Sequence, residues 1–188
     1  MKKSKFSVKR IVMDAVLIAI YVVLGYMKIP VGNLFRISLA PFSVIICAVA
    51  FSPVDGLIVG FMGEFLAQIL GPYGLTPTTV LWALPEGLRG LLLGLVMLLF
   101  IHKQLTPTVL MKSKSVVWYL LACIVTGVIA SLANTFALYV DSKMFGYYSY
   151  YMVFGVLLAR LGIAVVISGI LGYVSLTIVS ALHRNKIV

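Results

Sequence analysis

The stretch TPTTVLWALPEGLRG, Thr76–Gly90, decides how the rest of this chain is interpreted. It begins as a turn-like polar run and continues into an apolar helix, yet it carries three threonines, two prolines, a glutamate and an arginine. Polar groups in apolar surroundings are costly unless they meet a partner or a cavity. We therefore expect this stretch to form one wall of a small-molecule site in a membrane protein.

The composition is that of a polytopic helical membrane protein. Of the 188 residues, 62% are hydrophobic and only 11% are charged, and the mean hydropathy is +1.14. Long apolar runs of this kind form membrane-spanning helices, which satisfy their own backbone hydrogen bonds. The net charge of +10 raises nucleic acid as a partner. We expect none, because membrane proteins concentrate Lys and Arg in cytoplasmic loops.

The apolar runs predict an all-α fold, a single domain of residues 1–188 with six transmembrane helices. A basic segment, 1–7, and a short tail, 183–188, flank the bundle. The connection 28–36 contains Pro30 and Gly32 and is expected to be non-helical. Asp141 and Lys143 are assigned to a loop after the fifth helix. The six helices are expected at about 8–27, 37–51, 56–70, 77–101, 116–139 and 152–182.

The distribution of basic residues predicts the orientation. Six spans place both termini on one side, and that side would hold ten Lys and Arg residues against three on the other. By the positive-inside rule, both termini are then cytoplasmic and the protein is a multi-pass protein of the cell membrane. The ten are Lys2, Lys3, Lys5, Lys9, Arg10, Lys103, Lys112, Lys114, Arg184 and Lys186; the three are Lys28, Arg36 and Lys143.

Five polar residues interrupt the predicted helices. Ionisable groups at membrane depth usually face a partner or a cavity, so we expect a cavity shared by several helices. Two interpretations of Arg89 stay open. It lies three residues from Glu86, on the same helix face, and is either neutralised by it or free to bind an anionic ligand. The five residues are Glu64, Glu86, Arg89, Asn134 and Arg160.

Aromatic residues supply further candidates for ligand contact. Trp82 is the first choice, with a lipid-interface anchor as the alternative. The cluster Tyr147, Tyr148, Tyr150 and Tyr151 is divided between the same two roles. Thr76 is a candidate N-cap with Pro77 in the first helical position, which would direct the positive end of the helix to the mouth of the cavity.

The sequence contains no catalytic constellation. HExxH, GxSxG and Walker A motifs are absent, so we expect no enzyme activity and no ATPase within this chain. Cys47 and Cys123 lie in separate apolar runs, and His102 and His183 lie at helix ends without metal-ligand spacing. We expect neither a metal site nor a cofactor.

Two motifs, together with the six-helix plan, resemble the substrate-binding S components of energy-coupling factor (ECF) vitamin transporters. Ala15–Ala19, AVLIA, is similar to the AxxxA motif that docks onto the transmembrane coupling subunit in that family. Phe51–Gly56, FSPVDG, resembles its FGPxxG turn, with Ser52 in place of the first glycine. The resemblance implies docking through Ala15 and Ala19 onto that coupling subunit, which works with two cytoplasmic ATPase subunits. Packing within the bundle is the alternative for this small-residue face.

Three further motifs look like the folate/pantothenate-type branch of the family. They are Gly74–Thr79, Leu88–Gly90 and Asn134–Thr135. The resemblance places the ligand near the extracellular side and implicates Trp82, Arg89 and Asn134. Both vitamins carry a carboxylate, which suits Arg89. Pantothenate is preferred because the central motif holds a single arginine, and the alternative is folate or another water-soluble vitamin. The predicted contacts also include Glu86, Thr78 and Tyr150.

Two other classes of function compete with a vitamin-binding subunit. An intramembrane enzyme could use Glu64, Glu86 and the arginines, although no nucleophile–base pair supports it. A structural assembly subunit would have its polar residues fully paired.

Overall fold

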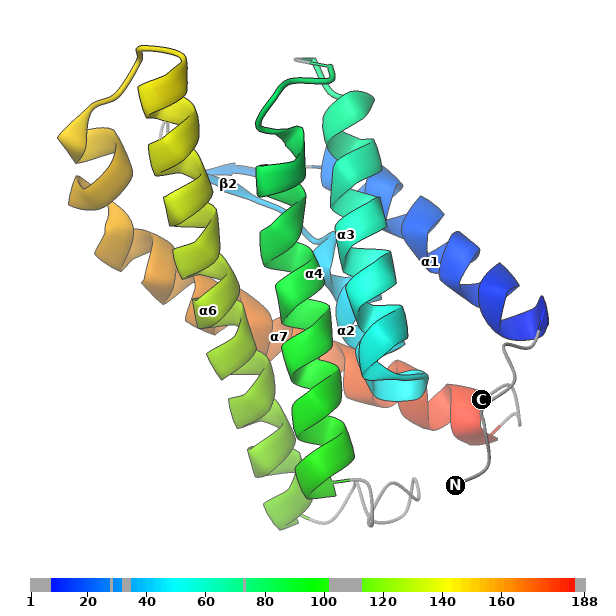
Figure 1. Cartoon of the computed structure of the whole chain (residues 1–188). Helices are drawn as coiled ribbons and strands as arrows, with labels where there is room; N and C mark the ends of the chain where they lie inside the picture. Colours follow the sequence, from blue (N-terminus) through cyan, green and yellow to red (C-terminus); the bar gives the residue numbers. More distant parts are fainter. Residues whose placement is uncertain (1–7, 28, 32–34, 73, 102–112, 185–188) are drawn as a thin grey trace.

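The protein is a bundle of helices with one short β-hairpin. The structure, a computed structural model, describes residues 8–27, 29–31, 35–72, 74–101 and 113–184. The predicted basic segment 1–7, the connector 102–112 and residues 185–188 lie outside these ranges. The elements are α1 (Val8–Tyr26), β1 (Ile29–Val31), β2 (Phe35–Ile37), α2 (Pro41–Ala50), α3 (Pro53–Ile69), α4 (Thr79–Val96), η1 (Met97–Ile101), α6 (Ser113–Met144), η3 (Tyr151–Gly155) and α7 (Leu157–Arg184) (Figure 1).

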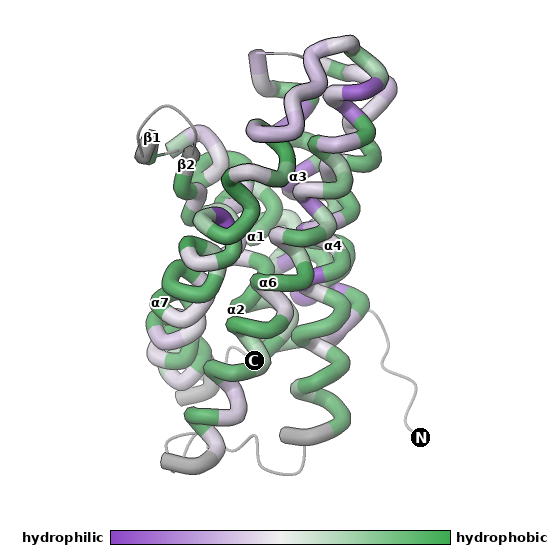
Figure 2. Tube along the Cα trace, turned by 90° about the vertical axis from the view of Figure 1, so that its left-hand side faces the viewer, coloured by the Kyte–Doolittle hydropathy of each residue, from purple (hydrophilic) through white to green (hydrophobic). Residues whose placement is uncertain are grey.

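The helical class of the fold is confirmed, with a hairpin in the connection that was expected to be non-helical. Strands β1 and β2 pair antiparallel, with Pro30 opposite Arg36. In the described residues, three helical stretches are long and apolar enough to cross a membrane: Thr79–Leu99, Ser115–Met144 and Tyr151–Ala181. Six spans and cytoplasmic termini stay predictions. Figure 2 shows hydrophobic residues along most of the helices, with hydrophilic stretches mainly at the end opposite the chain termini.

Helix α6 extends beyond its predicted end, and this corrects the assignment of Asp141 and Lys143 to a loop. Both lie in the last turns of α6, which ends at Met144. Gly146 has a left-handed backbone, with φ of 77°. Tyr147 N–H donates to Ser142 O at 3.0 Å, which is the hydrogen bond of a Schellman cap. The helix therefore continues past Asp141 and Lys143 and ends at Met144, just before the capping glycine.

Helices α3 and α4 pack backbone against backbone, and they lie side by side in Figure 1. A Cβ on Gly60 would lie 2.3 Å from Glu86 O, and one on Gly90 would lie 2.1 Å from Gly56 O. Only glycine fits such contacts, so these residues fix how closely the two helices approach. This pairing positions the C-terminal end of α3 beside the first turns of α4.

An ionic cluster attaches α1 to the α2–α3 turn, at the opposite end of α3. Ser52 Oγ accepts from Asp55 N–H at 3.3 Å and so caps α3. Arg10 forms an ion pair with Asp55, and its Nη2 donates to Ser52 Oγ at 2.5 Å. Because Asp55 is fully buried, the pairing with Arg10 compensates a charge that would otherwise be costly. The FSPVDG segment is therefore both a turn and an anchor for α1.

Candidate ligand site

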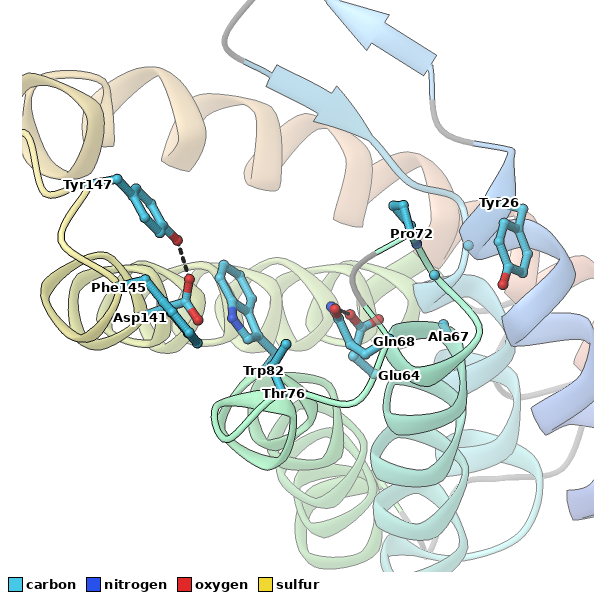
Figure 3. Close-up of a pocket in the computed structure, with 13 residues that line it drawn as sticks. Tyr26, Glu64, Ala67, Gln68, Pro72, Thr76, Trp82, Asp141, Phe145 and Tyr147 are labelled. Atoms are coloured by element: carbon cyan, nitrogen blue, oxygen red, sulfur yellow. Dashed lines mark hydrogen bonds between the residues drawn. The ribbon is translucent and has the colours of Figure 1, made fainter.

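A pocket lies at the end of the bundle where α3 ends and α4 begins. Its volume is about 1030 Å³, which is sufficient for a vitamin-sized molecule. Side chains from α1, α3, α4 and α6 and from the loops that follow α3 and α6 surround it (Figure 3). The described lining residues are Gly25, Tyr26, Glu64, Ala67, Gln68, Gly71, Pro72, Gly74, Thr76, Trp82, Asp141, Phe145 and Tyr147.

Glu64 supplies one wall of the pocket with a fixed carboxylate. Its Oε2 accepts a hydrogen bond from Tyr21 OH of α1, and its Oε1 accepts one from Gln68 Nε2, both at 2.7 Å. Tyr21 is only 1% exposed, so its hydroxyl has little freedom to turn elsewhere. Gln68 lies one turn beyond Glu64 on α3, as its spacing of four residues requires. The carboxylate is therefore held by two neighbours before any ligand arrives.

Asp141 supplies a second fixed carboxylate on the opposite wall. Its Oδ1 accepts from the Thr78 hydroxyl, and its Oδ2 accepts from Tyr147 OH. Thr78 precedes α4 and Tyr147 follows α6, so Asp141 joins three segments. The indole of Trp82 lies between Asp141 and Glu64 in Figure 3. The pocket thus presents an aromatic surface flanked by two acids.

The threonines before α4 form a compact polar turn. The predicted helix start at Pro77 is wrong by two residues, because α4 begins at Thr79. Thr76 N–H donates to Thr79 Oγ1 at 2.8 Å, and Thr79 N–H donates to Thr76 O at 3.1 Å. This pair of hydrogen bonds closes the turn before the helix begins. Thr78, with its hydroxyl engaged by Asp141, makes no side-chain cap.

The structure pairs Arg89 with Glu86. Arg89 Nη2 lies 3.4 Å from Glu86 Oε1, and both residues are buried. Neither is among the described residues that line the pocket. Glu86 Oε2 and Arg89 Nε have no hydrogen-bond partner within the described part of the chain. The geometry is that of mutual neutralisation, and a ligand contact for either residue stays a prediction.

The other predicted site residues lie apart from the pocket. Asn134 is on an exposed face of α6, and Tyr150 is 70% exposed beside Phe154. Ala15 and Ala19 are exposed on α1, on the face left uncovered by the bundle. Arg160 Nη2 donates to Met152 O at 2.8 Å. Of the polar and aromatic residues first considered for the site, Glu64, Trp82 and Tyr147 line the described pocket.

Sequence reasoning missed several pocket residues. Gln68 and Tyr26 carry no signal beyond their helical positions. Asp141 was hidden by the short prediction for α6, although Gly146 marks a helix end at the correct place. Among the described residues, the structure contains no cluster of His, Cys, Asp or Glu that could hold a metal ion.

A family model matches almost the whole chain. The model for "ECF-type riboflavin transporter, S component" matches residues 5–179. The chain belongs to this family. S components of ECF transporters are substrate-specific, vitamin-binding subunits of membrane transporters and are not themselves enzymes. ECF S components work with a module of transmembrane and ATPase subunits. The resemblance to ECF S components is confirmed, whereas the folate/pantothenate branch is not.

Solved structures share the fold of this S component. An S component for biotin from an ECF-type ABC transporter matches with a TM-score of 0.60 and 16% identity, over 98% of this chain and 95% of the other. The S component of a bacterial ECF transporter matches with a TM-score of 0.56 and 20% identity, over 95% of each chain. At these identities the likeness establishes the fold alone.

Curated relatives match over a shorter region. The UPF0397 proteins of Streptococcus pneumoniae strains CGSP14 and Hungary19A-6 are 36% identical to this S component over 93 residues, which is 48% of this chain and 49% of each relative. The chain thus spans about half the length of the curated relatives it matches.

Proposed function

We propose that this S component binds its vitamin in the pocket between Glu64, Trp82 and Asp141. One observation carries the proposal: an aromatic side chain lies between two anchored carboxylates in a cavity of about 1030 Å³. Concave sites that combine apolar walls with a few fixed polar groups are typical ligand sites. A coupling subunit and two ATPase subunits would then drive uptake, as the resemblance implied.

Riboflavin is the first candidate ligand. The family description includes it, and the pocket suits a flat ring system because Tyr26, Trp82, Phe145 and Tyr147 line it. Stacking on aromatic side chains would hold the isoalloxazine ring. The ribityl hydroxyls and the ring N–H are hydrogen-bond donors, which the two carboxylates could accept.

Pantothenate, the vitamin favoured by the sequence, and folate rank behind riboflavin. Each carries at least one carboxylate and would need a cationic partner. Among the described residues that line the pocket, none is Lys or Arg, and Arg89 already has Glu86 beside it. Both vitamins nevertheless belong in the binding test, because the sequence supports them.

A binding titration tests the proposal. The purified full chain in detergent is titrated with riboflavin, pantothenate and folate, each in a separate experiment, by calorimetry and, for riboflavin, by quenching of flavin fluorescence. Riboflavin is expected to bind, and Trp82→Ala should weaken binding at least tenfold. Trp118→Ala is the matched control, because Trp118 is 69% exposed on α6 and should leave affinity within a factor of two. Binding of none of the three vitamins contradicts the proposal.

We also propose that the pocket opens to the outside and that both termini are cytoplasmic. Figure 1 places the start of α1 and the end of α7 at one end of the bundle, and the C-terminal ends of α3 and α6, which contribute to the pocket lining, towards the other. The excess of Lys and Arg near the termini supports this orientation. Labelling of single cysteines introduced at Phe145 and at Arg184 with a membrane-impermeant reagent tests it: only the cysteine at position 145 should react in intact cells. Cys47 and Cys123 are buried and would be replaced by serine or alanine first.

A further inference from the structure

We infer that Glu64 and Asp141 set the charge selectivity of this pocket. They admit uncharged or cationic ligands that carry N–H or O–H donors at two separated positions, and they reject anions. The inference rests on the proposed function, because it concerns the ligand of the same pocket. According to this inference, the side chains of Glu64 and Asp141 determine which vitamins the pocket can bind.

Glu64 and Asp141 are acceptors with capacity to spare. An ionised carboxylate offers about four lone-pair sites and no donor. Each of the four oxygens already accepts one side-chain hydrogen bond, from Gln68 and Tyr21 at Glu64 and from Thr78 and Tyr147 at Asp141. Each oxygen can therefore accept one further hydrogen bond from a ligand. None of them can donate a hydrogen bond to an acceptor group of a ligand.

The partners that hold these carboxylates are all neutral. Tyr21, Gln68, Thr78 and Tyr147 orient the oxygens by hydrogen bonds and carry no charge that would offset the two carboxylates. In the described lining, no Lys or Arg offsets it. Lys143, on the same helix as Asp141, lies instead over the ring of Tyr148, 4.0 Å from its centroid. Two acids in a partly apolar cavity generate a negative potential that repels an anion and attracts a donor.

The spacing of the two acids adds a shape requirement. Glu64 projects from α3 and Asp141 from α6, and Trp82 lies between them in Figure 3. A ligand that meets both needs a flat central portion for the indole and donors towards each end. Riboflavin has this arrangement, with a ring N–H at one end and hydroxyls at the other, whereas its phosphate ester places a dianion at the hydroxyl end.

Matched ligand pairs test the inference on the unmodified protein. Each pair differs in one charged group: riboflavin and riboflavin 5′-phosphate, pantothenol and pantothenate, nicotinamide and nicotinate. In each pair that binds, the uncharged member should bind at least ~30-fold more tightly, since the charged group of the other member would be repelled by a carboxylate at its end of the pocket. Equal affinity for the two members of the best-binding pair overturns the inference while leaving the proposed function standing.

Isosteric variants then assign the effect to the two residues. Glu64→Gln and Asp141→Asn keep the shape and an acceptor oxygen but remove the charge. Each variant should reduce the preference for the uncharged member of a pair, measured as the ratio of the two affinities, about tenfold. The double variant should reduce this ratio further. Asp14→Asn is the control. Asp14 is a buried acid of α1 that accepts a hydrogen bond from the Cys47 thiol, and it does not line the described pocket. It should leave the ratio unchanged.

The outcomes separate the two proposals. An unchanged ratio in both variants, with affinity for the uncharged ligand retained, overturns the roles of Glu64 and Asp141. Thermal melting of each variant shows whether it is folded, and a variant that fails to fold is replaced by Glu64→Ser or Asp141→Ser. A wild-type chain that binds no member of any pair overturns the proposed function, and the inference with it.

Discussion

Tyr21 of α1 donates a hydrogen bond to Glu64 of α3 at 2.7 Å, while its ring fills the space left by a glycine of α3. A Cβ on Gly63 would lie 2.6 Å from Tyr21 Cγ. One residue of α1 therefore both packs against α3 and orients a carboxylate in the pocket. The exposed face of the same helix carries Ala15 and Ala19. Helix α1 consequently joins the ligand site to the proposed docking surface.

Removal of the Tyr21 hydroxyl should affect stability and ligand binding together. Tyr21→Phe keeps the ring but leaves Glu64 with Gln68 as its remaining side-chain partner. We expect a loss of about 1 kcal/mol in the free energy of unfolding and a several-fold loss of affinity. Thermal melting and vitamin titration measure the two effects. Tyr173→Phe, on an exposed face of α7, is the matched control; an equal response in both variants would contradict the role of the hydroxyl.

Glu86 and Arg89 should stabilise the fold as a pair, so that the effect of substituting one depends on whether the other is present. Arg89→Leu leaves the buried Glu86 carboxylate unpaired and should destabilise the protein by about 3 kcal/mol. The double variant Glu86→Leu, Arg89→Leu should be less destabilised than Arg89→Leu alone, because it removes both charges. A double-mutant cycle by thermal melting checks this. If the two effects simply add, the residues are not coupled.

The same variants decide the earlier prediction that Arg89 binds an anionic vitamin. In the folded double variant, affinity for riboflavin and for pantothenate should stay within about twofold of wild type, because the pair does not line the described pocket. A large and selective loss of pantothenate binding would instead restore Arg89 as a ligand contact.

Alanine at the α3–α4 contact should be strongly disruptive. In Gly90→Ala the new Cβ would lie 2.1 Å from a backbone oxygen, so the helices must separate. We expect a destabilisation of about 3 kcal/mol. Gly162→Ala provides the control, because apart from its chain neighbours and the adjacent backbone of α7 no atom lies within 4 Å of its Cβ position. That variant should be unchanged or slightly stabilised, since alanine favours the helix. Thermal melting in detergent distinguishes the two, and a mild effect of Gly90→Ala would show that the helices can shift cheaply.

A bulky residue on the exposed face of α1 should block assembly without affecting vitamin binding. We expect Ala15→Trp or Ala19→Trp to reduce copurification with the coupling subunit at least tenfold, while the purified chain retains its affinity for ligand. The mechanism is steric, because a small-residue face permits close helix approach and tryptophan does not. Ala159→Trp, on an exposed position of α7, is the control. Intact complexes with both α1 variants would place the docking surface elsewhere.

The apolar runs and the helix-breaking residues between them predicted the helical fold well. Pro30 and Gly32 marked the segment that forms the hairpin, and FSPVDG marked the turn where α3 begins. The site was less predictable, because a pocket depends on which helix faces meet. In the sequence, Asn134 and Glu64 are both polar residues within apolar runs. In the structure, Asn134 is exposed on α6, whereas Glu64 is hydrogen-bonded in the wall of the cavity. The sequence left Arg89 either neutralised by Glu86 or free to bind an anion, and the structure pairs it with Glu86.

The glycine contacts between α3 and α4 have a consequence for the timing of ligand exchange. Two helices in backbone contact cannot slide or separate without losing that contact, so they act as a rigid wall. Access to the cavity then depends on the segments around this wall, including the end of α6, where the Asp141 carboxylate accepts a hydrogen bond from Thr78. Breaking two hydrogen bonds at Asp141 is a small barrier compared with separating α3 from α4. The residence time of a bound vitamin should therefore be set by Asp141, Thr78 and Tyr147 rather than by the helices that form most of the pocket.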